Sequence, residues 1–447
     1  MALFPVPSPR APFEEIYPPL TADQALAETS RCLYCYDAPC IAACPTAIDI
    51  PTFIKKIGTG NLIGSARTIF EANILGGSCA RVCPVEVLCE GACVEKALVK
   101  EPVAIARLQR YATDHVLSRG IDVLVAGAPT GKSVGVIGAG PAGLGAAAEL
   151  RKLGHAVTIY DERRWGGGLN TYAMAEYKQT AALAIAEVQM VERLGAEIRQ
   201  GVAVGKDVTL QELLARHDRL FIGVGLGGTG RLNVPGDDLP LVHEALAWIE
   251  RLKQDPEGMP RLDGKRAVIV GGGNTAIDAV TQARRLGATA TLVYRRSEQQ
   301  MSAYRYEIAL AREMGCTLLF QRPLVRVEPA GLVVSGPNGE ELLPAELIIG
   351  AVGQGKRVSF LRDVPDLVLD ERGRVVVDQD YRTRNPRIFA GGDCVNGGKE
   401  AVNAVGEGKA AARAMHKALV EGAAAAKTAA VAPAPATSAG AAAARTP

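Results

Sequence analysis

The chain has 447 residues, 48% of them hydrophobic, and its 50 Lys and Arg nearly balance its 48 Asp and Glu. That balance gives no global electrostatic attraction to nucleic acid or to anionic membranes. No apolar run approaches the roughly 18 residues that a membrane span needs, and the start, MALFPVPSPRAPF, lacks the pattern of a signal peptide. We therefore expect a soluble, cytoplasmic protein of several domains.

The N-terminal region carries eight of the ten cysteines, all between Cys32 and Cys93. Their spacing is Cys-x2-Cys-x4-Cys-x3-Cys-Pro, then Cys-x3-Cys-Pro-x4-Cys-x3-Cys, and segments between them such as AIDIPTFIKKI predict short helices. Eight thiolates suit either two zinc ions or two 4Fe–4S clusters. Zinc ligands usually come as widely separated Cys-x2-Cys pairs, whereas a compressed run ending in Cys-Pro is typical of ferredoxins. The pattern favours two iron–sulfur clusters, and disulfides are the weakest interpretation.

A first βαβ unit begins near residue 130. SVGVIGAG predicts a strand and a tight turn, PAGLGAAAELRKLG a helix, and HAVTIYDE the next strand. Glycines in the turn let the backbone approach a pyrophosphate at the helix N-terminus. A carboxylate 23 residues after the first glycine can accept hydrogen bonds from ribose. The dinucleotide-binding residues predicted here are Gly138, Ala139, Gly140, Pro141, Ala142, Gly143 and Asp161.

A second βαβ unit repeats this pattern in RAVIVGGGNTA and the later strand ATLVYRR. The predicted nucleotide-binding turn consists of Gly271, Gly272, Gly273, Asn274 and Thr275. Arg295 and Arg296 stand where the first unit has its acid. Two guanidiniums can bind a 2′-phosphate through charge-assisted hydrogen bonds, so we expect NADP(H) more than NAD(H). The alternative is a solvated charge pair at the end of a strand.

A third element, FAGGD at residues 389–393, ends a late strand before a helix. It resembles the closing motif of two-dinucleotide flavoproteins, in which Gly392 and Asp393 would contact a flavin. This resemblance implies FAD at the first site and NAD(P)H at the second, within an inserted domain. Residues 223–227 and 351–353 resemble the two crossover strands, and the cofactor contacts expected on the second are Ala351, Val352 and Gly353. A thioredoxin-reductase-like disulfide enzyme is not expected, because Cys316 and Cys394 lack a nearby cysteine partner.

Three segments, RCLYCYDAPCIAACPTAIDIPTFIKKI, SCARVCPVEVLCEGAC and GGGLNTYAMAEYK, resemble the dihydropyrimidine dehydrogenase family. In the third segment the FAD-binding residues would be Gly168, Leu169 and Thr171. The resemblance implies one cluster held by Cys32, Cys35, Cys40 and Cys93. It implies a second cluster held by Cys44, Cys83, Cys89 and Gln109. Spacing alone would choose Cys79 in place of the glutamine, so the fourth ligand of the second cluster stays open.

In the resembled family a pyrimidine is reduced at FMN in a TIM-barrel domain, which is absent here. The resemblance therefore implies the electron-input subunit of a hetero-oligomer. It would oxidise NAD(P)H at FAD and pass electrons through two clusters to an FMN-containing TIM-barrel subunit that has further clusters and reduces uracil or thymine. No catalytic side chain is expected, since the flavin carries the chemistry.

Two other functions compete with this one. A glutamate synthase small subunit shares the architecture, and a metal-stapled scaffold with degenerate nucleotide folds would not be an enzyme. A further basic residue that the family uses for the 2′-phosphate is not evident, because Ser302 stands near its place.

We predict an α/β protein with a helical iron–sulfur domain and a Rossmann-like flavoprotein fold. The domains are 1–120 for the clusters, 121–242 and 349–421 for FAD, and 243–348 for NAD(P). Residues 422–447 are rich in Ala and Pro, so we expect a disordered tail.

Overall fold

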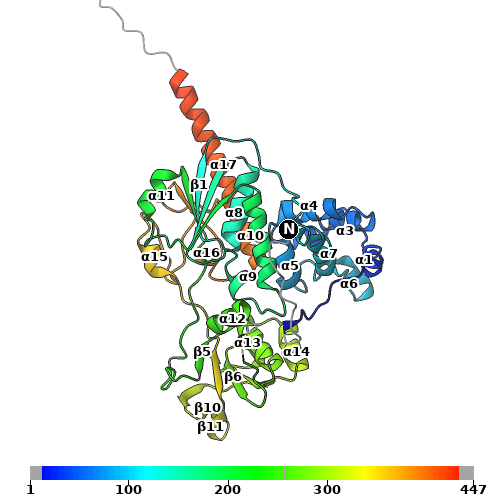
Figure 1. The fold of residues 1–447 in the computed structure, drawn as a ribbon, viewed down its shortest axis with the longest axis vertical. Coiled ribbons are helices and arrows are strands. Elements are labelled where there is room, and N and C mark those ends of the chain that lie inside the picture. Colours follow the sequence, from blue (N-terminus) through cyan, green and yellow to red (C-terminus); the bar gives the residue numbers. More distant parts are fainter. Residues whose placement is uncertain (1–12, 256–257, 259, 432–447) are drawn as a thin grey trace, which may run out of the picture.

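The computed structural model describes residues 13–255, 258 and 260–431. It confirms the predicted α/β class: a helical N-terminal lobe lies beside two separate parallel sheets, each flanked by helices (Figure 1). None of the described helices is both long and apolar enough to cross a membrane.

The N-terminal lobe is made of short helices joined by loops that carry most of its cysteines, while Cys40 lies in α2 and Cys79 in α5. In α3, Ile50, Phe53, Ile54 and Ile57 follow the helical period and are buried, which gives the lobe its own core. The helices of this lobe are α1 (Ala22–Thr29), α2 (Pro39–Ala42), α3 (Ile50–Gly58), α4 (Leu62–Ala72), α5 (Gly76–Val82), α6 (Val94–Val99) and α7 (Ile105–Leu117).

The first sheet has the order β13-β4-β1-β2-β3 and is parallel throughout. Its strands are β1 (Ser133–Ile137), β2 (Ala156–Asp161), β3 (Glu197–Gln200), β4 (Arg219–Ile222) and β13 (Ile388–Ala390). Its helices are α8 (Pro141–Lys152), α9 (Leu169–Tyr172), α10 (Ala181–Arg193), α11 (Leu210–Arg216), α15 (Val358–Arg362), α16 (Asp393–Asn396) and α17 (Ala401–Val431). A strand from late in the chain therefore completes a sheet that begins near residue 133.

The second sheet has the order β5-β12-β6-β7-β8 and is also parallel. Its strands are β5 (Val242–Glu244), β6 (Arg266–Val270), β7 (Thr289–Val293), β8 (Thr317–Leu319) and β12 (Leu347–Gly350). Its helices are α12 (Ala245–Gln254), α13 (Asn274–Arg285), the 3-10 turn η2 (Glu298–Gln300) and α14 (Arg305–Glu313). An antiparallel sheet that the sequence analysis does not name joins β9 (Leu324–Glu328), β10 (Gly331–Gly336) and β11 (Gly339–Pro344).

Two extended segments cross between the sheets, as the resemblance implies. They pair with each other: Gly227 N donates to Gly355 O at 2.8 Å, and Gly230 N donates to Gly353 O at 2.8 Å. Helix α17 continues to Val431, into the segment expected to be disordered, and the rest of that segment lies outside the described residues. The exact domain boundaries remain predictions.

Candidate functional site

The first nucleotide cavity lies at the carboxyl edge of the first sheet, where β1 turns into α8. Gly138 has a φ of +97°, and a Cβ there would lie 2.5 Å from Gly223 O. A Cβ on Gly143 would lie 1.9 Å from Gly138 O, so both positions require glycine. The cavity, about 370 Å³, faces the start of α8. The predicted residues that line it are Gly138, Gly140, Pro141, Ala142, Asp161, Gly168, Leu169, Gly392 and Asp393.

Other predicted residues make hydrogen bonds that support the wall of this cavity. Ala139 N donates to Asp161 Oδ2 at 2.7 Å, and Thr171 Oγ1 donates to Gly166 O at 2.7 Å. Asp161 Oδ1 also accepts from Arg163 N at 2.8 Å, so its carboxylate fastens the glycine turn. Burial raises the pKa of Asp161 despite these bonds.

Two acids around this cavity have roles that the sequence analysis missed. Glu162, next to Asp161, lines the wall and pairs with Arg357 at 2.8 Å. Glu407, on α17, accepts from Gly392 N at 2.7 Å and so holds the glycine that precedes Asp393. Neither acid belongs to a recognisable motif, although Glu162 directly follows the strand that ends in the predicted acid.

The second cleft, about 1360 Å³, opens at the carboxyl edge of the second sheet. Asn274 Oδ1 accepts from Tyr304 N at 3.1 Å, and Ser302 Oγ donates to Gly272 O at 3.3 Å, so the turn is braced by the 302–304 segment. Arg295 and Arg296 are both exposed, and of the two only Arg295 lines the cleft. The other predicted residues in the wall are Gly271, Gly272, Gly273, Asn274, Thr275, Ala351, Val352 and Gly353.

The two nucleotide cavities meet. Leu169, Met174, Leu226 and Asp393 are among the residues that line both. Two dinucleotides bound at the two turns would thus share walls, which is the arrangement that direct hydride transfer between them requires.

A buried ion cluster joins the two α/β units beside this meeting point, and the sequence analysis missed it. Lys178 Nζ lies 2.6 Å from Asp278 Oδ1 and 2.5 Å from Glu307 Oε1. Burial alone would lower the pKa of Lys178, but the two carboxylates hold it well above its usual range. The three residues come from a loop, α13 and α14, and no local pattern links them.

The cysteines line two separate cavities in the N-terminal lobe. The first is lined by Cys32, Cys35, Cys40 and Cys93, which is the set that the resemblance implies. The second is lined by Cys44, Cys79, Cys83, Cys89 and Gln109. In the part of the chain that the structure describes, no three His, Cys, Asp or Glu side chains lie at the spacing that a single metal ion needs.

The electrostatics of these cavities suit a cationic iron core. Burial, together with the neighbouring Cys93 and Cys32, raises the pKa of Cys40 to about 11. Burial, together with Glu90 and Cys44, also raises the pKa of Cys89. Thiolates gathered in this way become favourable only when metal ions neutralise them. The residues present therefore fit clusters ligated by cysteine.

Gln109 and Cys79 both stand in the wall of the second thiol cavity. Gln109 Nε2 donates to Gly76 O at 2.7 Å, so the amide nitrogen is engaged and the carbonyl oxygen is the group left for a metal. Asn73 Nδ2 donates to Cys79 Sγ at 3.1 Å. The helix α5 thus fixes both candidates for the fourth ligand.

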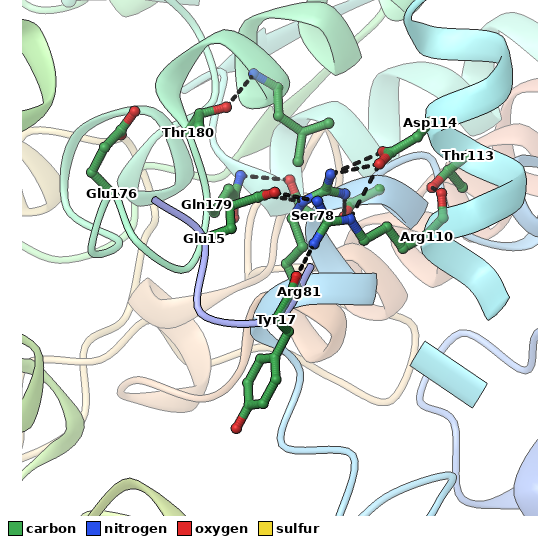
Figure 2. A network of polar contacts seen from close by, with 12 residues as sticks. Glu15, Tyr17, Ser78, Arg81, Arg110, Thr113, Asp114, Glu176, Gln179 and Thr180 are labelled. Atoms are coloured by element: carbon green, nitrogen blue, oxygen red, sulfur yellow. Dashed lines mark hydrogen bonds and ion pairs between the residues drawn. The ribbon is translucent and has the colours of Figure 1, made fainter. Parts of the chain in front are cut away.

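A buried polar network fastens the thiol-bearing lobe to the first α/β unit (Figure 2). Arg81 lies 2.8 Å from both Glu15 and Asp114, and Gln179 Nε2 donates to Ser78 Oγ at 2.7 Å. Glu187 on α10 accepts from Gly77 N at 2.7 Å and from Ser78 N at 3.0 Å. The start of α5 is therefore held by side chains of the flavoprotein fold.

Comparison with known proteins agrees with this geometry. Residues 132–408 match the family of pyridine nucleotide-disulphide oxidoreductases. The chain belongs to this family. Residues 9–121 match dihydropyrimidine dehydrogenase domain II, 4Fe-4S cluster. The chain is an NAD(P)H-dependent flavin oxidoreductase with FAD- and NAD(P)-binding units and an iron–sulfur domain.

Two relatives match this chain over about nine-tenths of its length. The chain is 36% identical to the NAD-dependent dihydropyrimidine dehydrogenase subunit PreT of Escherichia coli K12, over 92% of this chain and 98% of that protein. It is 34% identical to the glutamate synthase (NADPH) small chain of Halomonas elongata, over 89% and 92%. Thioredoxin reductase from T. acidophilum has a similar fold, with a TM-score of 0.54, 22% identity, and coverage of 65% of this chain and 99% of that one.

Proposed function

We propose that this chain is the electron-input subunit of a dihydropyrimidine dehydrogenase. It oxidises NAD(P)H at FAD and passes the electrons through two 4Fe–4S clusters to a partner subunit, an FMN-containing TIM barrel that reduces uracil or thymine. The observation that carries the proposal is the pair of four-thiol cavities beside two nucleotide cavities that meet each other. The name and activity of the relative PreT support it.

The order of the relay follows from the first turn of α17. Ala401 and Ala404 line the first nucleotide cavity, and Val402 lines the second thiol cavity. One helical turn therefore separates the proposed FAD site from the proposed second cluster, whereas α17 contributes no residue to the wall of the first thiol cavity. A flavin accepts an electron pair as hydride and can release the electrons one at a time, which an iron–sulfur cluster can take up.

In this scheme the chain's own residues bind and orient the two nucleotides. The N-termini of α8 and α13 face the two pyrophosphate positions. The ion cluster of Lys178, Asp278 and Glu307 holds the two units in register, so that the two nucleotides meet at the shared wall. No described side chain has to donate or accept a proton for the hydride step.

The second candidate function is that of a glutamate synthase small subunit, supported by 34% identity to that chain. The segment GGGLNTYAMAEYK, which includes Gly168 and Leu169 in the first cavity, favours the pyrimidine enzyme, because the synthase subunit would read closer to GGLLRYGIP there.

The test is anaerobic purification followed by iron, sulfide and flavin assays, an absorption spectrum, and titration with NADH and NADPH. We expect about eight irons and one FAD per chain, with the visible absorption bleached by a reduced nicotinamide nucleotide. Zinc without flavin would overturn the proposal. Mixing the protein with an FMN-containing TIM-barrel subunit should then give uracil-dependent oxidation of the nucleotide; oxidation dependent on glutamine and 2-oxoglutarate with a synthase large chain would favour the second candidate.

A further inference from the structure

Helix α17 touches both the nucleotide-binding turn and a cysteine loop with its backbone. A Cβ on Gly406 would lie 2.8 Å from the carbonyl oxygen of Pro45, the residue after Cys44. A Cβ on Gly408 would lie 2.0 Å from Ala142 O at the start of α8. Glycine at these two positions allows one helix to lie directly between the two sites.

Lys409, the next residue on α17, reaches across to the thiol-bearing lobe. Its Nζ donates to Ala72 O at 2.9 Å and lies 3.5 Å from Thr46 O. Ala72 is the last residue of α4, and Thr46 Oγ1 lies 3.3 Å from Cys44 Sγ. A lysine of the flavoprotein fold thus holds the loop that carries a thiol of the second cavity.

The charge of Lys409 is not neutralised by an ion pair within the part of the chain that the structure describes. Among the described residues, no Asp or Glu oxygen lies within ion-pair distance of its ammonium group. The nearby Glu149 is engaged by Lys152 at 2.6 Å and by Arg413 at 2.7 Å. Burial lowers the pKa of Lys409, as expected for a cation that is desolvated without a close counterion.

The negative charge that would balance this lysine belongs to the neighbouring cavity. Cys44, Cys83 and Cys89 are expected to enter a cluster as thiolates, and a cluster with thiolate ligands is anionic and becomes more so when it gains an electron. A cation close to such a group favours the reduced form, and the effect is strong where water is excluded.

We propose that Lys409 is a positioning residue for electron transfer, which holds the 44–46 loop against α17 and places a positive charge that raises the reduction potential of the cluster in the second thiol cavity. This inference rests on the proposed function, since it requires a cluster in that cavity. The Lys409 side chain thereby holds the lobe close to the FAD site and also makes it easier for the cluster to accept an electron from FAD.

The chain offers a matched control. Lys152 Nζ donates to Glu71 O at 2.9 Å, at the same end of α4, but its contacts are with that helix and with Glu149 and not with the Cys44 loop. Lys152→Met removes the same charge and the same kind of helix-end hydrogen bond. A purely structural role at the end of α4 would therefore give Lys152→Met and Lys409→Met the same phenotype.

The experiment is a redox titration followed by electron paramagnetic resonance on the anaerobically purified full chain, with the second cluster assigned by the signal lost in Cys89→Ser. Lys409→Met should lower the midpoint potential of that cluster, while Lys409→Arg and Lys152→Met keep the wild-type value. If Lys409→Met loses the cluster, Lys409→Gln provides the uncharged side chain that can still donate hydrogen bonds, and the same shift is expected.

The results separate this inference from the proposed function. Full iron content with an unchanged potential in the uncharged variants, or an equal shift in Lys152→Met, would overturn the role of Lys409 and leave the proposed function intact. A wild-type chain without iron would overturn both.

Discussion

Replacing Glu187 by Gln should remove a large pH-dependent loss of stability. The Glu187 carboxylate is fully buried between α10 and the start of α5, where Oε1 accepts from two backbone N–H groups and Oε2 contacts the Ser78 hydroxyl. Burial raises its pKa from 4.5 to about 7, even though the bonds from Ser78 and Gly77 oppose the rise. The Glu187 carboxyl group therefore keeps its proton to a higher pH in the folded chain than in the unfolded chain.

The sign and size of the effect follow from linkage. Between pH 4.5 and about 7 the unfolded chain releases the Glu187 proton while the folded chain keeps it, so this group's stabilising contribution is complete below pH 4.5 and is lost as the pH rises through about 7. At about 1.4 kcal/mol per pH unit, that interval amounts to about 3 kcal/mol of unfolding free energy. A glutamine at this position does not titrate.

The assay is urea unfolding of the anaerobic holoprotein at several pH values between 5 and 8, for wild type and Glu187→Gln. As the pH rises across this range, the unfolding free energy of wild type should fall relative to that of the variant by most of about 3 kcal/mol. Comparing the two proteins also cancels the contribution of Glu90, whose pKa burial likewise raises to about 7. The exposed Glu101→Gln makes the same change in net charge and should show no such trend. A difference between Glu187→Gln and wild type that stays constant with pH would refute the reasoning.

Three further experiments test the predicted cofactor ligands by substitution. Cys35→Ser should lower the iron content from about eight to about four atoms per chain, measured by iron and sulfide assays; unchanged content would remove it from the ligand set. Gln109→Leu should lose or alter the paramagnetic signal of the second cluster while Cys79→Ser leaves it unchanged, and the reverse pattern would make Cys79 the ligand. Arg295→Ala with Arg296→Ala should raise the Kd of NADPH by about tenfold to a hundredfold through the loss of charge-assisted hydrogen bonds, with little effect on NADH. Equal losses for both nucleotides, measured by titration of the flavin absorbance, would contradict a phosphate-binding role.

The parts of the molecule that the sequence predicts well depend on local patterns. Glycine spacing predicts both strand–turn–helix units, because the same few residues make the turn and begin the helix. Cysteine spacing identifies the lobe, but the division into two cavities depends on folding, which brings Cys93 back to the first three cysteines. The pairing of the crossover segments was accessible only through the family resemblance.

The residues that the sequence does not reveal belong to no local motif and contact partners that are far away in the sequence. Lys178, Asp278 and Glu307 meet from three elements, and Glu187 reaches residues more than a hundred positions earlier in the chain. Each looks like an ordinary helix or loop residue in its own segment. Asp161, the last residue of β2, is predicted to accept hydrogen bonds from a ribose, and its oxygens also accept from the backbone N–H groups of Ala139 and Arg163.

The late arrival of β13 and α17 has a consequence for biogenesis. During synthesis the cysteine-bearing lobe leaves the ribosome first, but the wall of its second cavity includes Val402, and the first sheet gains β13 only when residue 388 and those after it have emerged. Domains generally fold as they are made, and contacts between distant segments form slowly. A nascent chain therefore exposes the Cys44 side of its lobe until almost the whole protein has been translated. Covering of the proposed second cluster site and closure of the flavin fold therefore become the same late event.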